Sequence, residues 1–160
     1  MRFVSDGMLG RLTRWLRLLG YDVTYLNDFS DAKILEVAEE EGRILLTNDV
    51  ALYRSAKRRG VEAYLVDGEN EPQRLANMAK RLNIVLDVDT TVSRCPACNS
   101  TIEMIEKSEV EEKVPPNTLK MYDEFWVCRG CGKIYWQGGH WKKIEEALAE
   151  ARVMLEEKES

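Results

Sequence analysis

The residues best suited to chemistry in the first half of the chain are acids that follow short apolar runs. Asp6 follows FVS, Asp49 follows ILLTN and Asp67 follows a run ending at Val66, while Asp31 opens a helical segment. Carboxylates that converge in space raise one another's pKa unless a divalent cation neutralises them. Oxygen ligands of this kind suit Mg²⁺ or Mn²⁺, which also bind phosphate and can activate a water for attack on a phosphodiester.

Each of these acids also has a structural interpretation, because acids cap helices and occupy turns. Asp6 and Asp49 each precede a helical segment. Asp31 follows a serine at a helix start, and Asp67 lies in an Asp-Gly turn. Taken singly, each acid is explained better by capping or turn formation, and only their joint placement favours a metal site. Asp28 and Glu36 are alternatives to Asp31 as a ligand.

A second set of chemical residues consists of two Cys-x-x-Cys pairs, Cys95 with Cys98 and Cys128 with Cys131. Four thiolates in this arrangement predict a tetrahedral Zn²⁺ site without an open catalytic position. The 29 residues between the pairs exceed the commoner spacing of about 15 to 20, so a long loop containing Pro115-Pro116 must project between them. A redox role is the alternative, but two copies favour zinc, which would stabilise a unit this small.

The acids are positioned by alternating strand-like and helical segments in the first ninety residues. We expect strands at 2–5, 22–26, 43–47 and 61–66, and helices at 8–19, 31–41, 50–59 and about 72–82. Four β-α repeats predict an α/β fold with a parallel sheet and helices on both faces. Ligands of such folds bind outside the carboxyl ends of the strands, so the acids are expected along one edge.

A polar linker at 87–94 divides the chain into two expected units, 1–90 and 91–160. The second unit carries the cysteines and strand-like runs at 101–105, 125–128 and 133–136. It is followed by a helical pattern from 141 to about 156. We therefore expect a small zinc ribbon and a terminal helix that packs back on one of the two units.

Basic and aromatic residues occur near both sets. Arg11, Arg14 and Arg17 recur every three residues on the first helix, where they would contact phosphates or, alternatively, form a solvated face. In the second unit cations and aromatics occur together, as on surfaces that hold single-stranded RNA by charge and stacking. These residues are Arg94, Lys133, Trp136, His140 and Trp141. The alternative is that the aromatic residues there form the ribbon's core.

Composition limits the class of partner. With 160 residues and 44% hydrophobic content, the chain fits one ordinary domain plus a small appendage. A net charge of -5 argues against a generally basic nucleic-acid binder, so RNA would have to meet a local patch. The sequence shows no apolar leader and no stretch of membrane-spanning length, so we expect a cytoplasmic protein without membrane contact.

Four stretches covering both halves of the chain carry a family resemblance: FVSDGMLGRLTRWLRLLGYDV (3–23), SDAKILEVAEEEGRILLTND (30–49), RCPACN (94–99) and CRGCGKIYWQGGHW (128–141). Together they resemble the Mut-seven C-terminal RNase family, a PIN-like nuclease domain followed by a zinc ribbon. The resemblance implies a metal-dependent ribonuclease site. Asp6 matches the acid after the first strand, and Asp31 matches the acid opening the second helix.

Thr47-Asn48-Asp49 resembles the family's Thr-x-Asp, whose hydroxyl and carboxylate face the metal. The fourth acid of the fuller pattern has no clear counterpart, so Asp6, Asp31 and Asp49 are expected to hold one Mg²⁺ or Mn²⁺ ion and a second only with substrate. His140 matches the family's Gly-x-His segment, which implies a phosphate contact or a role in domain packing.

Two functional hypotheses follow from these observations. The first is a metal-dependent endoribonuclease that attacks single-stranded or structured RNA with metal-generated hydroxide, while the ribbon positions the RNA. The second is a non-catalytic RNA-binding or ribosome-associated adaptor with the same fold. A small-molecule phosphohydrolase should carry a nucleophile in an Asp-x-Asp motif, and Asp6-Gly7-Met8 lacks the second acid. The sequence identifies neither the target RNA, nor a protein partner, nor an oligomeric state.

Overall fold

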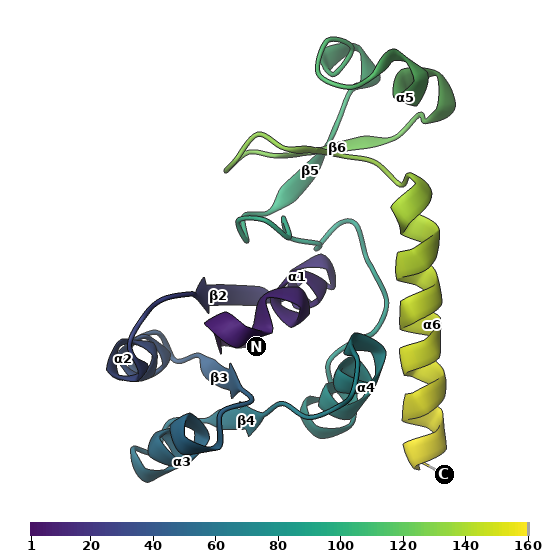
Figure 1. Ribbon diagram of the computed structural model, residues 1–160. Helices are drawn as coiled ribbons and strands as arrows, with labels where there is room; N and C mark the ends of the chain where they lie inside the picture. The colour runs from purple at the N-terminus through teal and green to yellow at the C-terminus, as the bar shows by residue number, and fades with distance from the viewer. Residues whose placement is uncertain (160) are drawn as a thin grey trace.

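A computed structural model of the chain describes residues 1–159 (Figure 1). Its first unit contains a four-stranded parallel sheet in the order β2-β1-β3-β4. The strands are β1 (Arg2–Asp6), β2 (Asp22–Leu26), β3 (Ile44–Thr47) and β4 (Ala63–Leu65). The predicted parallel α/β sheet is therefore confirmed, and all four carboxyl ends lie along one edge.

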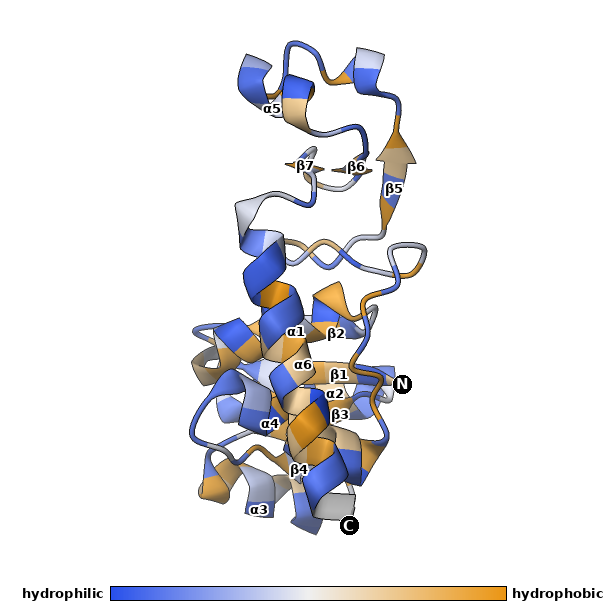
Figure 2. Ribbon diagram, turned by 90° about the vertical axis from the view of Figure 1, so that its right-hand side faces the viewer, coloured by the Kyte–Doolittle hydropathy of each residue, from blue (hydrophilic) through white to orange (hydrophobic). Residues whose placement is uncertain are grey.

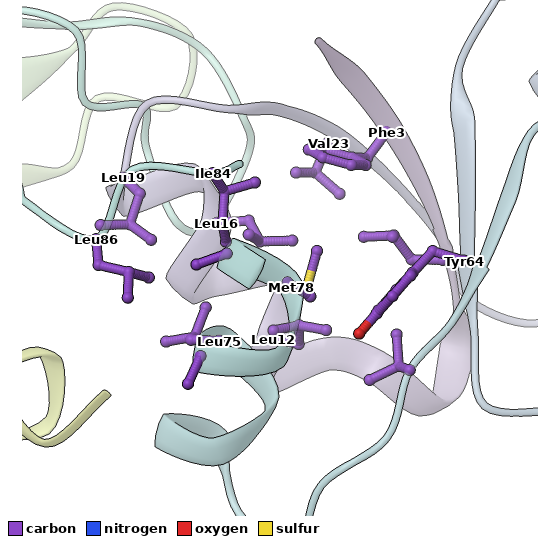
Figure 3. Close-up of a cluster of buried hydrophobic side chains, with 14 of the residues drawn as sticks. Phe3, Leu12, Leu16, Leu19, Val23, Tyr64, Leu75, Met78, Ile84 and Leu86 are labelled. Carbon is purple, nitrogen blue, oxygen red and sulfur yellow. The ribbon is translucent and has the colours of Figure 1, made fainter. Parts of the chain in front are cut away.

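Helices cover both faces of this sheet. They are α1 (Gly10–Leu18), preceded by the 3₁₀ turn η1 (Gly7–Leu9), and α2 (Asp31–Glu41), α3 (Val50–Arg58) and α4 (Glu71–Leu82). Neighbouring strand residues point to opposite faces. Phe3 and Leu46 accordingly join a core with residues of α1 and α4, while Val4 and Leu45 join one with residues of α2 and α3. Figure 3 shows side chains of the first core meeting from strands and helices.

Local signals explain the helix boundaries. The Ser30 hydroxyl caps α2 by accepting from the Lys33 amide at 3.2 Å, and α2 ends at Gly42, whose φ is +62°. A left-handed residue at this position suits glycine because it has no Cβ. The Asn70 side chain caps α4 by accepting from the Gln73 amide at 2.9 Å. These ends match the predicted segments within a few residues.

The second unit is built on a three-stranded antiparallel sheet in the order β5-β6-β7. Its strands are β5 (Ile102–Ile105), β6 (Phe125–Cys128) and β7 (Ile134–Tyr135). The connection from β5 to β6 contains a 3₁₀ turn, η2 (Lys107–Glu109), and a short helix, α5 (Pro116–Met121), that the sequence did not predict. Val110 and Val114 from this connection pack on Phe125. The projecting loop therefore supplies part of the ribbon's own core.

The long terminal helix α6 (Gly139–Glu159) joins the two units. It begins at the ribbon, just after β7, and runs along the first unit beside α4 (Figures 1 and 2). Leu148 and Ala151 are buried in the core that contains α1 and α4, and the Arg152 guanidinium donates to the Leu86 carbonyl at 2.9 Å. The helix thus packs back as expected, on the first unit. No helix within residues 1–159 has the length and apolar character needed to cross a membrane.

Candidate active site and metal centre

A buried acid lies at the carboxyl edge of the sheet. Asp6, at the end of β1, is 6% exposed. Its Oδ1 accepts from the Met8 amide at 2.9 Å, and its Oδ2 accepts from the Thr47 hydroxyl at the end of β3. Among the side chains of residues 1–157 no Lys or Arg forms an ion pair with Asp6. A buried carboxylate without a cation is costly, so this position favours a bound positive charge.

Thr47 connects this acid to Asp49. The Asp49 amide donates to Thr47 Oγ1 at 3.0 Å, so one hydroxyl links the end of β1 to the loop after β3. Oδ1 of Asp49 caps α3 by accepting from the Ala51 and Leu52 amides at 2.8 and 3.3 Å. Among the residues that the structure describes, Oδ2 of Asp49 has no hydrogen-bond donor. Asp49 therefore serves as a cap and still presents one oxygen at the edge.

The other two predicted acids lie at the outer strands. Asp31 is exposed in the first turn of α2, the helix that follows edge strand β2. Asp67 follows the opposite edge strand, β4, where its Oδ1 accepts from the Tyr64 hydroxyl and from Asn77, both at 3.3 Å. Burial, together with the nearby Asp67 charge, raises the pKa of Tyr64 to about 12. The strand order thus separates Asp67 from Asp6.

Convergence of the acids is incomplete in this structure. For the described part of the chain, the one group of three or more acidic, histidine or cysteine side chains spaced to hold an ion is the four cysteines. Thr47 brings Asp6 and Asp49 into one network, whereas Asp31 is not gathered with them. The exposed side chains of Asp31 and Asp49 would have to rotate to share an ion with Asp6.

A cleft of about 540 Å³ opens beside Asp6 and is lined by Gly7, Met8, Arg11, Tyr25 and Arg74, among others. The Tyr25 hydroxyl donates to the Gly7 carbonyl at 2.7 Å. A Cβ on Gly7 would lie 2.5 Å from the side-chain oxygen and 3.3 Å from the Cα of Asn27, so the glycine lets the loop after β2 approach closely. The glycine after Asp6 therefore shapes this edge, a role that sequence reasoning missed.

The four cysteines form a compact cluster. Sγ of Cys95 lies 3.8 Å from that of Cys131, Sγ of Cys98 lies 3.4 Å from that of Cys128, and all four atoms fall within 4.8 Å of one another. Tetrahedral zinc with bonds of about 2.3 Å separates its sulfur ligands by about 3.8 Å, whereas a disulfide bond is about 2.05 Å long. The arrangement suits a structural zinc ion.

Thiol acidity differs within this cluster. Hydrogen bonds from the hydroxyl and amide of Ser100 lower the pKa of Cys98 to about 6, which favours its thiolate at neutral pH. Burial raises the pKa of Cys128 to about 11. Metal binding requires thiolates, so a bound ion must displace the Cys128 proton.

Arg17 occupies a different place from the one predicted. It is 7% exposed, and its Nε and Nη2 donate to the Val23 carbonyl at 3.0 and 2.8 Å. Its Nη1 donates to the carbonyl of Pro96, inside the first cysteine pair, at 3.0 Å. Burial lowers the pKa of this guanidinium. Arg17 therefore connects the two units and does not face phosphates, whereas Arg11 and Arg14 are exposed on α1 as expected.

A second polar contact holds the ribbon on the sheet. The Asn99 side chain accepts from the Val23 amide at 3.1 Å and donates to Asp22 at 2.8 Å, and Arg43 pairs with Asp22 at 2.9 Å. Burial alone would raise the pKa of Asp22, but the hydrogen bonds from Arg43 and Asn99 outweigh it and lower that pKa. Asp22 begins β2, so the ribbon docks at the amino edge, opposite Asp6.

The remaining predicted RNA-binding residues lie on or near the ribbon. Arg94 is partly buried and donates to the Asn99 carbonyl at 2.9 Å, while Lys133 and His140 are exposed. The cationic side chains therefore differ in accessibility. Lys133 and His140 face solvent, and Arg94 mainly supports the cysteine loop.

Comparisons with known proteins extend this description. A family model described as the Mut7-C RNAse domain matches residues 1–148. The chain belongs to the Mut7-C RNAse domain family. A curated relative, the human "Exonuclease mut-7 homolog", is 37% identical over 101 residues, which cover 61% of this chain and 12% of the relative. This chain thus corresponds to a small part of that protein. No solved structure matches.

The match to the Mut7-C RNAse domain includes both chemical features of the chain. Residues 1–148 contain the Asp6 network, the four cysteines and the first part of α6. Membership in a family described as an RNAse domain supports a nuclease-type function.

Proposed function

We propose that this Mut7-C RNAse domain is a PIN-like, divalent-metal-dependent endoribonuclease that hydrolyses RNA phosphodiester bonds at the carboxyl edge of its sheet. The observation that carries the proposal is the buried Asp6 carboxylate, which has no cationic partner among the side chains of residues 1–157 and is linked through Thr47 to Asp49. Such an acid at this edge is better explained by a cation site than by capping alone.

The donor set fits Mg²⁺ or Mn²⁺, because it consists of oxygen atoms only. Asp6 and Asp49 would hold the ion, and Asp31 would complete the set from α2. When bound, such an ion lowers the pKa of a coordinated water and stabilises the leaving oxygen.

The protein's own groups orient the reacting partners. Hydrogen bonds from the Thr47 hydroxyl and the Met8 amide hold both oxygens of Asp6 in place. The carboxylate is therefore already oriented before the reaction, and no entropy is lost in ordering it during the reaction. Capping of α3 holds Asp49 in place through one oxygen and leaves the other at the edge. Helix α1 begins next to this edge. Its exposed cations Arg11 and Arg14 would bind phosphates flanking the cleaved bond.

A non-catalytic RNA-binding or ribosome-associated adaptor is the second candidate. The observation in its favour is that, among the described residues, the carboxylates of Asp6, Asp31 and Asp49 do not form a group spaced for an ion. In that case Asp31 and Asp49 would act only in the helix starts where they lie, and the protein would bind RNA without cleaving it.

The decisive experiment is cleavage of linear and circular RNA in Mn²⁺, in Mg²⁺ and without added ion. Asp6→Asn and Asp49→Asn should abolish cleavage, and asparagine keeps the capping role of Asp49. Asp123→Asn, at an acid on the ribbon that is 95% exposed, is the matched control and should cleave like wild type.

Zinc content and circular dichroism should be equal in all variants. Cleavage of circular RNA would establish an endonuclease, since an exonuclease needs a free end. Cleavage that survives both edge substitutions would refute the proposal, and RNA binding without cleavage by the wild type would favour the adaptor.

A further inference from the structure

Three hollows lie in a row between the acidic edge and the ribbon. The first is the cleft at Gly7, next to Asp6 in the chain, and its lining includes Arg11 together with the acids Glu69 and Glu71. The second, of about 220 Å³, is lined by Arg11, Arg14 and Trp15 of α1 and shares Pro96 and Ile144 with the third. The third, of about 350 Å³, lies where the ribbon meets the start of α6. Shared lining residues make the three hollows one continuous surface along α1.

The third hollow is an aromatic pocket, a name used here for the space lined by Trp126, Trp136, Trp141, Gln137 and His140. Two of its tryptophans belong to the ribbon's framework. Trp126 is buried in β6, and the ring of Trp136 packs on that of Phe125 with centroids 6.1 Å apart.

Trp141 differs from the other two tryptophans. It is only partly buried in the first turn of α6, and its Nε1 donates to Glu145 at 2.7 Å, which fixes the ring in place. His140 is exposed at the pocket and Gln137 is exposed beside it. The pocket therefore combines a positioned aromatic ring with hydrogen-bonding groups at its mouth.

Charge on the connecting surface identifies the class of ligand. The whole chain carries a net charge of -5, yet the hollow between the edge and the aromatic pocket is lined by two arginines and no acid. Proteins that bind single-stranded nucleic acids combine cations along the phosphate backbone with aromatic rings on which bases stack. A volume of about 350 Å³ is near the small end for ligand sites and suits one planar group.

We propose that single-stranded RNA follows this surface away from the acidic edge, with phosphates on Arg11 and Arg14 and one unpaired nucleobase in the aromatic pocket, stacked on Trp141. The inference rests on the proposed function and adds to it a base-binding position remote from the cleaved bond. Double-stranded RNA has no free base to place there, so the pocket makes the protein prefer unpaired strands.

Two substitutions test the pocket and one tests the path to it. Trp141→Ala removes the stacking ring. Gly139→Leu adds a bulky side chain at the wall of the pocket, because Gly139 lines it and an added Cβ there meets no other atom within 4 Å. Arg14→Ala removes a phosphate contact, and Arg54→Ala is its matched control. Arg54 is likewise exposed and is the fifth residue of α3, on the opposite face of the sheet.

Binding is measured by fluorescence anisotropy of labelled oligouridylates of about 4 to 16 nucleotides, a range that covers known single-strand sites. Mg²⁺ and Mn²⁺ are left out, so the readout does not depend on cleavage. Trp141→Ala and Gly139→Leu should weaken binding of the longer strands about tenfold, within the range measured for base stacking. Arg14→Ala should reduce the slope of log K against log salt by about 0.7, and Arg54→Ala should leave it unchanged.

Tryptophan emission gives an independent readout, since three of the four tryptophans line the pocket. Long single strands should quench it, and a strand abasic at the nucleotide that reaches the pocket should quench it less. Equal affinity of both pocket variants and wild type, or equal binding of duplex RNA, would overturn the inference. If these binding effects appear but no RNA is cleaved in Mn²⁺, the nuclease proposal fails and the base-binding position stands.

Discussion

Replacing Arg17 by methionine should strongly destabilise the protein. The affinity of the folded protein for RNA should hardly change, because Arg17 does not face the proposed RNA path. The methionine keeps the length and packing of the arginine stem. It removes the donors to the Val23 and Pro96 carbonyls, which belong to different units. The same change at Arg14, one turn earlier and exposed, is the control.

The magnitude follows from the two carbonyls that lose their donor. Hydrogen bonds to a charged group contribute about 1.5–3 kcal/mol each, so two acceptors give about 3–6 kcal/mol. Methionine recovers the cost of burying a cation, which places the net loss near the lower end, at about 3 kcal/mol. With a urea slope of about 2 kcal/mol per molar, the unfolding midpoint should fall by about 1.5 M.

Urea unfolding of the zinc-loaded protein, followed by circular dichroism, measures this change. Arg14→Met should shift the free energy of unfolding by less than about 0.5 kcal/mol, as exposed substitutions usually do. Arg17→Met should be the less stable variant, whereas Arg14→Met should bind RNA more weakly when both variants are folded. Equal stability of the two variants, together with an RNA defect confined to Arg17→Met, would refute the assignment of Arg17 as an inter-unit contact.

Two further predictions concern pH and metal. Burial and the Asp67 charge raise the pKa of Tyr64 from 10.0 to about 12, so its neutral form contributes stability below pH 10 that is lost as pH rises through about 12. Urea midpoints should therefore fall more steeply between pH 10 and 12 in wild type than in Tyr64→Phe, and parallel curves would contradict the assignment. Chelation should release one zinc per chain and raise amide hydrogen exchange in residues 95–136, because the ribbon depends on its ion. Amides of β1 and β3 should stay protected, and unchanged exchange in the ribbon would argue against a structural zinc.

Periodicity and turn residues were sufficient to predict the sheet and its helices. The run Ile44–Thr47 is a short apolar segment closed by a polar residue and is buried throughout, whereas Asp22–Leu26 alternates between polar and apolar residues. Glycines at helix ends, such as Gly42, placed the boundaries correctly. The helix α5 was missed because six residues are too few to show a period, although Pro116 in its first turn is a recognised helix-start signal.

Arg17 shows why a side chain's environment is harder to predict than its element. Residues three apart on a helix differ by about 300°, so each step falls about 60° short of a full turn. Two steps carry Arg17 about 120° away from Arg11, from the exposed side to the buried one. The docked ribbon then supplies the Pro96 carbonyl, a partner 79 residues away in sequence.

The sequence was sufficient to predict which edge of the sheet carries the candidate site, but not how the acids there lie relative to one another. The resemblance to the family's Thr-x-Asp implied that the Thr47 hydroxyl and the Asp49 carboxylate face one site, and in the structure the Asp49 amide donates to the Thr47 hydroxyl. The order β2-β1-β3-β4 is a tertiary property, and it places Asp67 two strands away from Asp6. The orientation of exposed acids such as Asp31 depends on rotamers and ions that no sequence pattern specifies.

The position of α6 determines when the protein can finish folding during synthesis. Residues of β1 to α4 leave the ribosome first, yet their core includes Leu148 and Ala151, which are made more than sixty residues later. Until then the side of α4 that packs against α6 stays exposed. The first unit is therefore completed only after the ribbon has been made, so translation delivers both candidate metal sites before the helix that joins them is in place.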